Sequence, residues 1–271
     1  MKENEYFTVH RPFANVYHIE DRLGVHVTLI VGEERGLLID TGSGIGNLPA
    51  EAARLTDKPI TVVNTHGHID HFGGNYQFDR VLINEKELAV AKHSVELLDI
   101  RKIVYDQMQK DDLIPEGFDA DKYYAYDFGN LAVLEEDAVF DLGGITVRCV
   151  PMHSHTPGMT GFYVDELKLL IGGDSVCAMV CLYFEEASDL ETHLKMLREV
   201  EKLPFEHILG SHSSRLMDRS DFSAFIECAE NYDEHKTVRY RDPYYPSYGG
   251  RMFVYENNSG NAAIIVYNNR R

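Results

Sequence analysis

Residues 65–71 read Thr-His-Gly-His-Ile-Asp-His and directly follow the apolar run Ile-Thr-Val-Val at 60–63. Side chains at positions i and i+2 of an extended chain point the same way, so His66 and His68 can face one ion where the strand opens into a loop. Gly67 allows the backbone to bend between them. This spacing predicts a metal site at the end of an apolar strand.

The next two polar residues, Asp70 and His71, extend this set of metal-binding groups. Because His71 is displaced to a different side of the turn from Asp70, one loop can serve two adjacent ions. Imidazole and carboxylate ligands suit zinc, iron or manganese. No cysteine stands nearby, which argues against a closed thiolate site of the structural zinc kind.

The loop resembles, residue for residue, the His-x-His-x-Asp-His signature of the metallo-β-lactamase superfamily, in particular its glyoxalase II-like and lactonase-like hydrolases. Further landmarks of that superfamily have counterparts here in the same order along residues 7–212. They are an apolar strand at 36–39 before Asp40-Thr41-Gly42, a His-Thr-Pro-Gly segment at 155–158, a strand at 169–173 before Asp174, and a strand and turn before His212.

The resemblance implies a dinuclear centre with two divalent metal ions, with Zn²⁺ expected and Fe or Mn as alternatives. In that family pattern Asp174 bridges the two ions. One ion would take His66, His68 and His155, and the other would take Asp70, His71 and His212.

The implied chemistry is hydrolysis of a small ester-like molecule, such as a lactone, a thioester or another carboxyl ester, by a metal-bridged hydroxide. Asp70 and Asp174 are the candidate catalytic residues, and Asp70 can also pass a proton to the leaving group. Three alternatives stay open: a phosphodiesterase, an iron-dependent oxidoreductase of the persulfide dioxygenase type, and a non-catalytic metal-binding protein.

Composition narrows the possible partners. The formal net charge of −18 would repel nucleic acid and anionic membranes, so we expect a small-molecule substrate.

No apolar run approaches the ~18 residues of a membrane helix, and no secretory signal follows Met1, so we expect a cytoplasmic enzyme. The four cysteines show no Cys-x-x-Cys pair and are expected to be reduced. The sequence does not indicate an oligomeric state.

The predicted fold is α/β, an αββα sandwich of two mixed β-sheets flanked by helices, formed by residues 1–271 as a single domain. Within it we expect a helical and irregular insertion at about 85–131, which either covers the substrate or is a surface helix pair with an aromatic seam. A β-hairpin is expected at about 251–268. Other expected strands are 7–19, 25–31, 81–83, 133–140 with 144–150, 160–164 with 167–171, and 205–209; expected helices are 48–55, 85–109, 189–203 and 219–234.

Several other side chains have two interpretations each. Asp40 either accepts a hydrogen bond from a ligand histidine or forms a turn. His153 could compete with His155 for an ion, although the Thr-Pro-Gly that follows favours His155. His26 is expected to be packed in a strand or to line a pocket as a donor, rather than to bind a metal. Aromatic candidates for the pocket wall are Tyr183, Phe184 and residues 123–126, and an aromatic loop is expected at 242–250.

Overall fold

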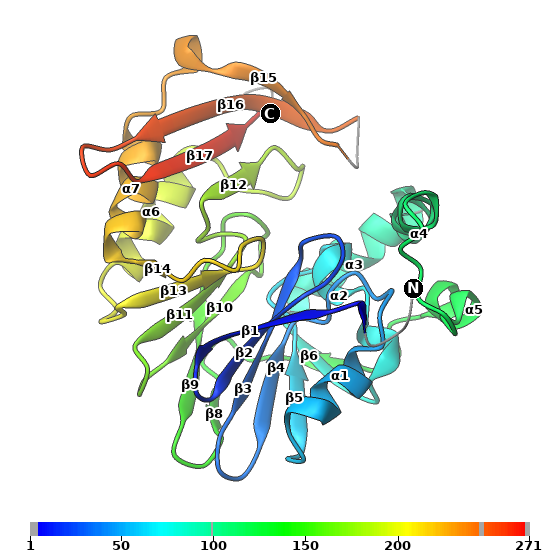
Figure 1. Cartoon of the computed structure of the whole chain (residues 1–271). Helices are drawn as coiled ribbons and strands as arrows, with labels where there is room; N and C mark the ends of the chain where they lie inside the picture. The colour runs from blue at the N-terminus through cyan, green and yellow to red at the C-terminus, as the bar shows by residue number, and fades with distance from the viewer. Residues whose placement is uncertain (1–4, 99, 244–246, 269–271) are drawn as a thin grey trace. The chain divides into compact units, whose positions relative to one another are not determined.

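The computed structural model describes residues 5–98, 100–243 and 247–268 (Figure 1). The chain divides into two compact units. The first runs as far as Arg148 and also includes His212–Ser214, whereas the second comprises Cys149–Ser211 and the chain from Arg215 onwards. Both units combine strands with helices, which confirms the α/β class, and the expectation of a single domain stays a prediction.

A mixed sheet organises the first unit, with its strands side by side in chain order from β1 to β7. The pairs from β1 to β4 are antiparallel, and those from β4 to β7 are parallel. Parallel strands place their carboxyl ends at the same edge, so the residues after β4 and β5 meet. The strands are β1 Thr8–Phe13, β2 Val16–Glu20, β3 His26–Val31, β4 Gly36–Ile39, β5 Ile60–Val63, β6 Val81–Ile83 and β7 Leu131–Val133.

Helix α1 (Leu48–Leu55) packs on this sheet through Leu48 and Ala52, which lie one helical turn apart and join the core around Leu29 and Leu38. The predicted helix at 85–109 is divided into α3 (Glu85–Leu98) and α4 (Ile100–Lys110), with residue 99 outside the described residues. The remaining helices of this unit are α2 Ile69–Phe72, a 3-10 turn at Asn75–Gln77, and α5 Ala120–Ala125.

Two strand predictions in this unit were wrong. Residues 7–19 form two paired strands with a turn after Phe13, because His10 pairs with His18 and Phe13 with Val16. The expected strand 133–140 is interrupted, because Val133 ends β7 beside β6 and only Val139–Asp141 forms β8. The acidic residues between them make a turn. Strand β8 then pairs antiparallel with β9 (Thr146–Pro151), as the expected hairpin requires.

The second unit contains the end of β9 and two groups of paired strands. In one, β10 is antiparallel to β11, β11 is parallel to β13, and β13 is antiparallel to β14. In the other, β17 lies between β12 and β16, and β15 pairs with β16, as the orange and red strands of Figure 1 show. The strands are β10 Thr160–Val164, β11 Leu169–Gly173, β12 Met179–Leu182, β13 His207–Gly210, β14 Met217–Asp218, β15 Val238–Arg241, β16 Gly249–Glu256 and β17 Ala262–Tyr267.

Two capped helices complete this unit, together with a 3-10 turn at Glu234–Lys236. Asp189 caps α6 (Leu190–Val200) by accepting from the Thr192 amide, and Asp218 forms a capping box at α7 (Arg219–Glu230). Both helices were predicted, as was the hairpin of β16 and β17, whereas β12, β14 and β15 were not. The expected aromatic loop at 242–250 lies partly outside the described residues, which exclude 244–246.

None of the described helices is long and apolar enough to cross a bilayer.

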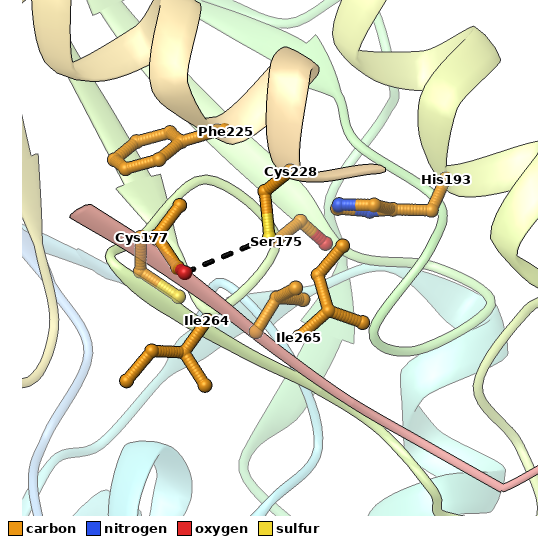
Figure 2. Close-up of a pocket in the computed structure, with 9 residues that line it drawn as sticks. Ser175, Cys177, His193, Phe225, Cys228, Ile264 and Ile265 are labelled. Atoms are coloured by element: carbon orange, nitrogen blue, oxygen red, sulfur yellow. Dashed lines mark hydrogen bonds between the residues drawn. The ribbon is translucent and has the colours of Figure 1, made fainter. Parts of the chain in front are cut away.

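A small cavity lies inside the second unit, bounded by α6, α7 and β17 (Figure 2). Its lining is mostly buried and apolar, and the thiol of Cys228 donates to the Ala263 carbonyl at 3.6 Å. His193 of α6 also lines it, with Nδ1 2.9 Å from Ser154 Oγ. Burial, and to a smaller extent the neighbouring His155 imidazole, lower the pKa of His193 to about 3. The cavity therefore belongs to the core and contains a histidine held neutral.

This burial predicts sensitivity to acid. Between a pH of ~6.5 and ~3 the unfolded state binds a proton at residue 193 that the folded state does not bind. As the pH is lowered through that window, the free energy of unfolding should therefore decrease. This residue contributes at most about 1.4 kcal/mol per pH unit to the decrease. Urea unfolding between pH 6 and pH 4 should show a shallower pH slope for His193→Gln than for the wild type. The control His235→Gln removes an exposed histidine, and an equal slope in His193→Gln and the wild type would contradict the assignment.

Candidate metal centre

The first unit brings five of the predicted ligands together. The His66 ring lies edge-to-face with His68, at a centroid distance of 4.8 Å, and 4.0 Å from the His71 ring. The rings of His71 and His212 are 5.6 Å apart. His66 and His71 are buried, whereas the side chain of His212 is 44% exposed. The site therefore has a closed inner side and an open outer side.

Asp70 joins two of these rings. Its Oδ2 lies 3.4 Å from Nε2 of His71 and 3.5 Å from Nε2 of His212. All three ligand atoms lie within 4.8 Å of one another. Tetrahedral ligands at ~2.0–2.2 Å from a zinc ion are themselves ~3.3–3.6 Å apart. The spacing and the nitrogen and oxygen donors of these residues thus fit a divalent cation such as Zn²⁺.

A buried aspartate, Asp40, orients the ligand loop. It follows β4, and its backbone φ of +67° is a left-handed value that aspartate and asparagine tolerate better than most residues. Its Oδ2 accepts from Nδ1 of His71 at 2.8 Å, so Nε2 is the ring nitrogen of His71 that is left to face an ion. The hydrogen bond expected from Asp40 to a histidine of the loop is therefore present.

Asp40 also acts on His66 through Thr65. The Thr65 amide donates to Asp40 Oδ1 at 2.7 Å, and the Thr65 hydroxyl donates to Oδ2 at 2.8 Å. Since a hydroxyl has one hydrogen to donate, Thr65 Oγ1 accepts from Nδ1 of His66, 3.0 Å away. This arrangement again leaves Nε2 as the ring nitrogen without a proton, so one carboxylate sets the tautomers of two histidines.

Two further residues support the segments that carry the predicted ligands, and the sequence analysis identified neither of them. Glu87 of α3 is fully buried, and its Oε2 accepts from the Gly67 amide at 2.7 Å. His18 of β2 lies 3.2 Å, through Nε2, from the carbonyl oxygen of Ser213, beside His212. Both contacts join segments far apart in the chain, so no local pattern indicates them.

The second unit contains the other two predicted ligands. Nδ1 of His155 donates to the Cys181 carbonyl at 2.7 Å, and Nε2 lies 3.8 Å from Asp174 Oδ2. Ser175 joins the two segments, because its Oγ accepts from the His155 amide at 3.2 Å and donates to the Met152 carbonyl at 2.8 Å. His155 is thus oriented as His71 is, with Nδ1 engaged. His153 is half-buried two residues earlier, and the choice of His155 over it stays a prediction.

Aromatic side chains proposed for a pocket wall differ in their surroundings. Phe184 lies edge-on to His155, at a centroid distance of 5.8 Å, and 5.5 Å from Tyr248. The hydroxyl of Tyr183 donates to Asp242 at 2.5 Å, and burial raises the pKa of Tyr183. Phe184 is therefore in ring contact with a predicted ligand of this unit.

The insertion at 85–131 contains the expected aromatic seam. Tyr123 is buried and contacts Tyr76 and Phe118, and the guanidinium of Arg101 lies over the Tyr126 ring. Burial raises the pKa of Tyr123 and lowers that of Arg101. A role of this insertion as a cover for the substrate stays a prediction.

Comparison with known proteins agrees with these observations. Residues 21–212 match the family model described as the metallo-beta-lactamase superfamily. An acyl-coenzyme A thioesterase MBLAC2 from Bos taurus is 27% identical over 163 residues, which are 56% of this chain and 58% of that protein. A hydroxyacylglutathione hydrolase from Hyphomonas neptunium is 26% identical over 72% of this chain and 64% of its own length. The chain thus spans less than two thirds of the length of either relative.

The solved structure of a metallo-beta-lactamase from Pontibacter korlensis aligns with a TM-score of 0.60 and 19% identity. The alignment covers 83% of this chain and 100% of that one. At this identity the likeness shows the fold, and it confirms the fold predicted from the sequence.

The role of Asp40 can be tested with Asp40→Asn, because asparagine also tolerates the left-handed backbone. An amide nitrogen in place of Oδ2 would donate to Nδ1 of His71 and move the ring proton to Nε2. We expect metal affinity to fall by roughly 10- to 100-fold in equilibrium dialysis. Asp57→Asn, at an exposed position, is the matched control. Unchanged affinity in Asp40→Asn would leave Asp40 as a turn former only.

The close approach of the ligand loop to α3 predicts the effect of Gly67→Ala. A Cβ at residue 67 would lie 2.4 Å from the Glu87 carbonyl oxygen and 2.8 Å from the Ala91 amide nitrogen. Because both are backbone atoms, we expect the free energy of unfolding to fall by about 1–3 kcal/mol. Denaturant titration checks this, with Gly36→Ala as the control, since a Cβ there has no neighbour closer than 3.4 Å. Equal losses in both variants would argue against this constraint.

Proposed function

The chain belongs to the metallo-beta-lactamase superfamily, and from that membership and the geometry above we propose that it is a metal-dependent hydrolase of thioesters. The observation that carries the proposal is the group formed by Asp70, His71 and His212, whose ligand atoms lie within 4.8 Å of one another. The printed names of two relatives, an acyl-coenzyme A thioesterase and a hydroxyacylglutathione hydrolase, support the choice of thioesters.

We propose two cations, with Zn²⁺ as the expected metal. The assignment rests on the family resemblance and on the order of the motifs along the chain. The ligands proposed for one ion are His66, His68 and His155, those for the other are Asp70, His71 and His212, and Asp174 is proposed as the bridge.

When bound, two divalent cations supply Lewis-acid activation of water and of the scissile carbonyl at neutral pH. The protein itself supplies orientation. Asp40 keeps Nδ1 of His71 protonated, and the Cys181 carbonyl does the same for His155, so each ring presents Nε2. The proposed role of Asp70, whose side chain is 30% exposed, is to relay a proton to the leaving group.

The leaving group of a thioester suits this arrangement. A thiol has a pKa near ~8.5, whereas an alcohol has a pKa far higher, so a thiolate leaves with little help from an acid. Asp70, with its basicity reduced by its proposed role as a ligand, is a weak proton relay. This limitation matters less for a thioester than for a carboxyl ester or a phosphodiester.

The thiol that carries the acyl group, coenzyme A or glutathione, affects how the substrate interacts with the acidic chain. Coenzyme A carries several phosphate charges and glutathione carries carboxylates, whereas the chain has a formal net charge of −18. This repulsion is stronger for the polyphosphate, so a coenzyme A ester would require local cations around its entry route. Comparing the two carriers therefore identifies which one the protein recognises.

The first experiment measures turnover of acyl-coenzyme A, hydroxyacylglutathione, a lactone, a carboxyl ester, a phosphodiester and a β-lactam by one preparation. We expect thioester hydrolysis that disappears after chelation, returns with Zn²⁺, and falls by at least ~100-fold in His212→Ala. His235→Ala removes an exposed histidine elsewhere and should retain full activity.

Other outcomes separate the alternatives. Turnover of the phosphodiester alone would favour a phosphodiesterase. Oxygen uptake with a single bound iron and a persulfide substrate would favour the oxidoreductase. Two bound metals with no turnover of any substrate in the set would contradict the proposed hydrolase and favour a binding role. Residence in the cytoplasm remains a prediction of the sequence.

A further inference from the structure

A second group of potential metal ligands lies on the strands β1, β2 and β3 of the first unit. In the register of these strands His10 is opposite His18, and Glu20 is opposite His26. Residues 18 and 20 are two apart on β2 and therefore share a face of the sheet. Three imidazoles and one carboxylate thus lie on one face, and neither the family pattern nor the proposed hydrolysis uses them.

Glu20 stands between two of the histidines. Its Oε2 lies 2.8 Å from Nε2 of His10 and 3.7 Å from Nε2 of His26. The ligand atoms of the three residues all lie within 4.8 Å of one another. Since tetrahedral zinc ligands are ~3.3–3.6 Å apart, small side-chain movements would bring all three to bonding distance of one ion.

The third imidazole, that of His18, supports the position of His26 and is not one of the proposed ligands. Its ring stacks on His26 with a centroid distance of 4.5 Å and an interplanar angle of 22°. Its Nδ1 lies 3.0 Å from the Thr28 hydroxyl, and its Nε2 lies 3.2 Å from the Ser213 carbonyl oxygen. A carbonyl can only accept, so Nε2 carries the proton and Nδ1 accepts from Thr28 in the neutral ring. The stacked ring of His18 restricts the plane of the His26 imidazole.

Burial of the three groups suits an ion that keeps an open position. The side chain of His26 is only 3% exposed, whereas those of His10 and Glu20 are each 33% exposed. An ion would therefore have protein on its inner side and water on its outer side. A surface ion pair of His10 with Glu20 would account for two of the groups. The buried imidazole of His26 lies 3.7 Å from the same carboxylate oxygen, so an ion at this point would contact all three side chains.

We propose that His10, Glu20 and His26 form a separate binding site for a divalent transition-metal ion, with Zn²⁺ as the ion of choice. Two imidazoles and one carboxylate with water in the remaining position are a ligand set that zinc accepts. The site shares no ligand with the proposed hydrolytic centre.

The test counts bound Zn²⁺ in the full chain by equilibrium dialysis of metal-free protein. We expect His10→Ala and Glu20→Gln each to bind one equivalent fewer than the wild type and to retain its rate of ester hydrolysis. Val9→Ala is the matched control, because residue 9 is on the same strand but on the opposite face, and it should bind the wild-type number. Titration with Co²⁺ gives a second readout, since the visible absorption of one cobalt site should be missing from both ligand variants.

An equal metal count in Glu20→Gln and the wild type would overturn the proposal. The proposal would also be overturned if replacing the loop histidines 66, 68 and 71 removed all of the Zn²⁺ that the wild type binds. Glu20→Gln keeps the shape of the side chain, so its thermal unfolding should match that of Val9→Ala, which excludes misfolding as the cause of a lost equivalent. Failure of the hydrolase proposal would appear as absent turnover with an intact metal count, and is therefore distinguishable.

Discussion

The burial of one carboxylate, that of Asp40, constrains the rest of the first unit's site. Removing a carboxylate from water costs several kcal/mol unless donors surround it, and here the donors are the amide and hydroxyl of Thr65 and Nδ1 of His71. These donors come from the loop after β5 and from α2, whereas Asp40 follows β4. The parallel pairing of β4 with β5 brings these ends together, so the sheet topology and the protonation state of the histidines depend on each other.

The same physical rule governs the second unit with a different acceptor. A histidine can bind a metal through Nε2 only if Nδ1 carries the proton, and an oxygen acceptor at Nδ1 enforces that state. The acceptor is a carboxylate for His71, a hydroxyl for His66 and a backbone carbonyl for His155. The contact to the His71 ring is therefore charged, whereas the contact to the His155 ring is neutral. The family signature specifies the histidines but leaves these acceptors to the fold.

Local sequence patterns predicted most strands and the longer helices, because each depends on residues close together in the chain, but they did not predict the short helices α2 and α5. The strand prediction for 7–19 was wrong, since apolar and aromatic content alone does not show the turn after Phe13 that the pairing of β1 with β2 requires. The contacts of Glu87 with Gly67 and of His18 with Ser213 join residues 20 and 195 positions apart. A local sequence pattern does not indicate contacts between residues so far apart, so these supporting contacts could not be predicted, whereas the ligand assignment rests on local motifs and stays a prediction.

The group of His10, Glu20 and His26 is a second feature that local sequence patterns could not predict. Its members are spaced irregularly in the sequence and become neighbours only through the register of three antiparallel strands, in which a slip of one residue would turn Glu20 to the opposite face. Strand β2 also carries His18, which stacks on His26 and lies in hydrogen-bonding distance of Ser213, the neighbour of His212. The register of a single strand therefore positions a ligand of the second site and the segment that carries a ligand of the first. A substitution that shifted β2 would be expected to disturb both.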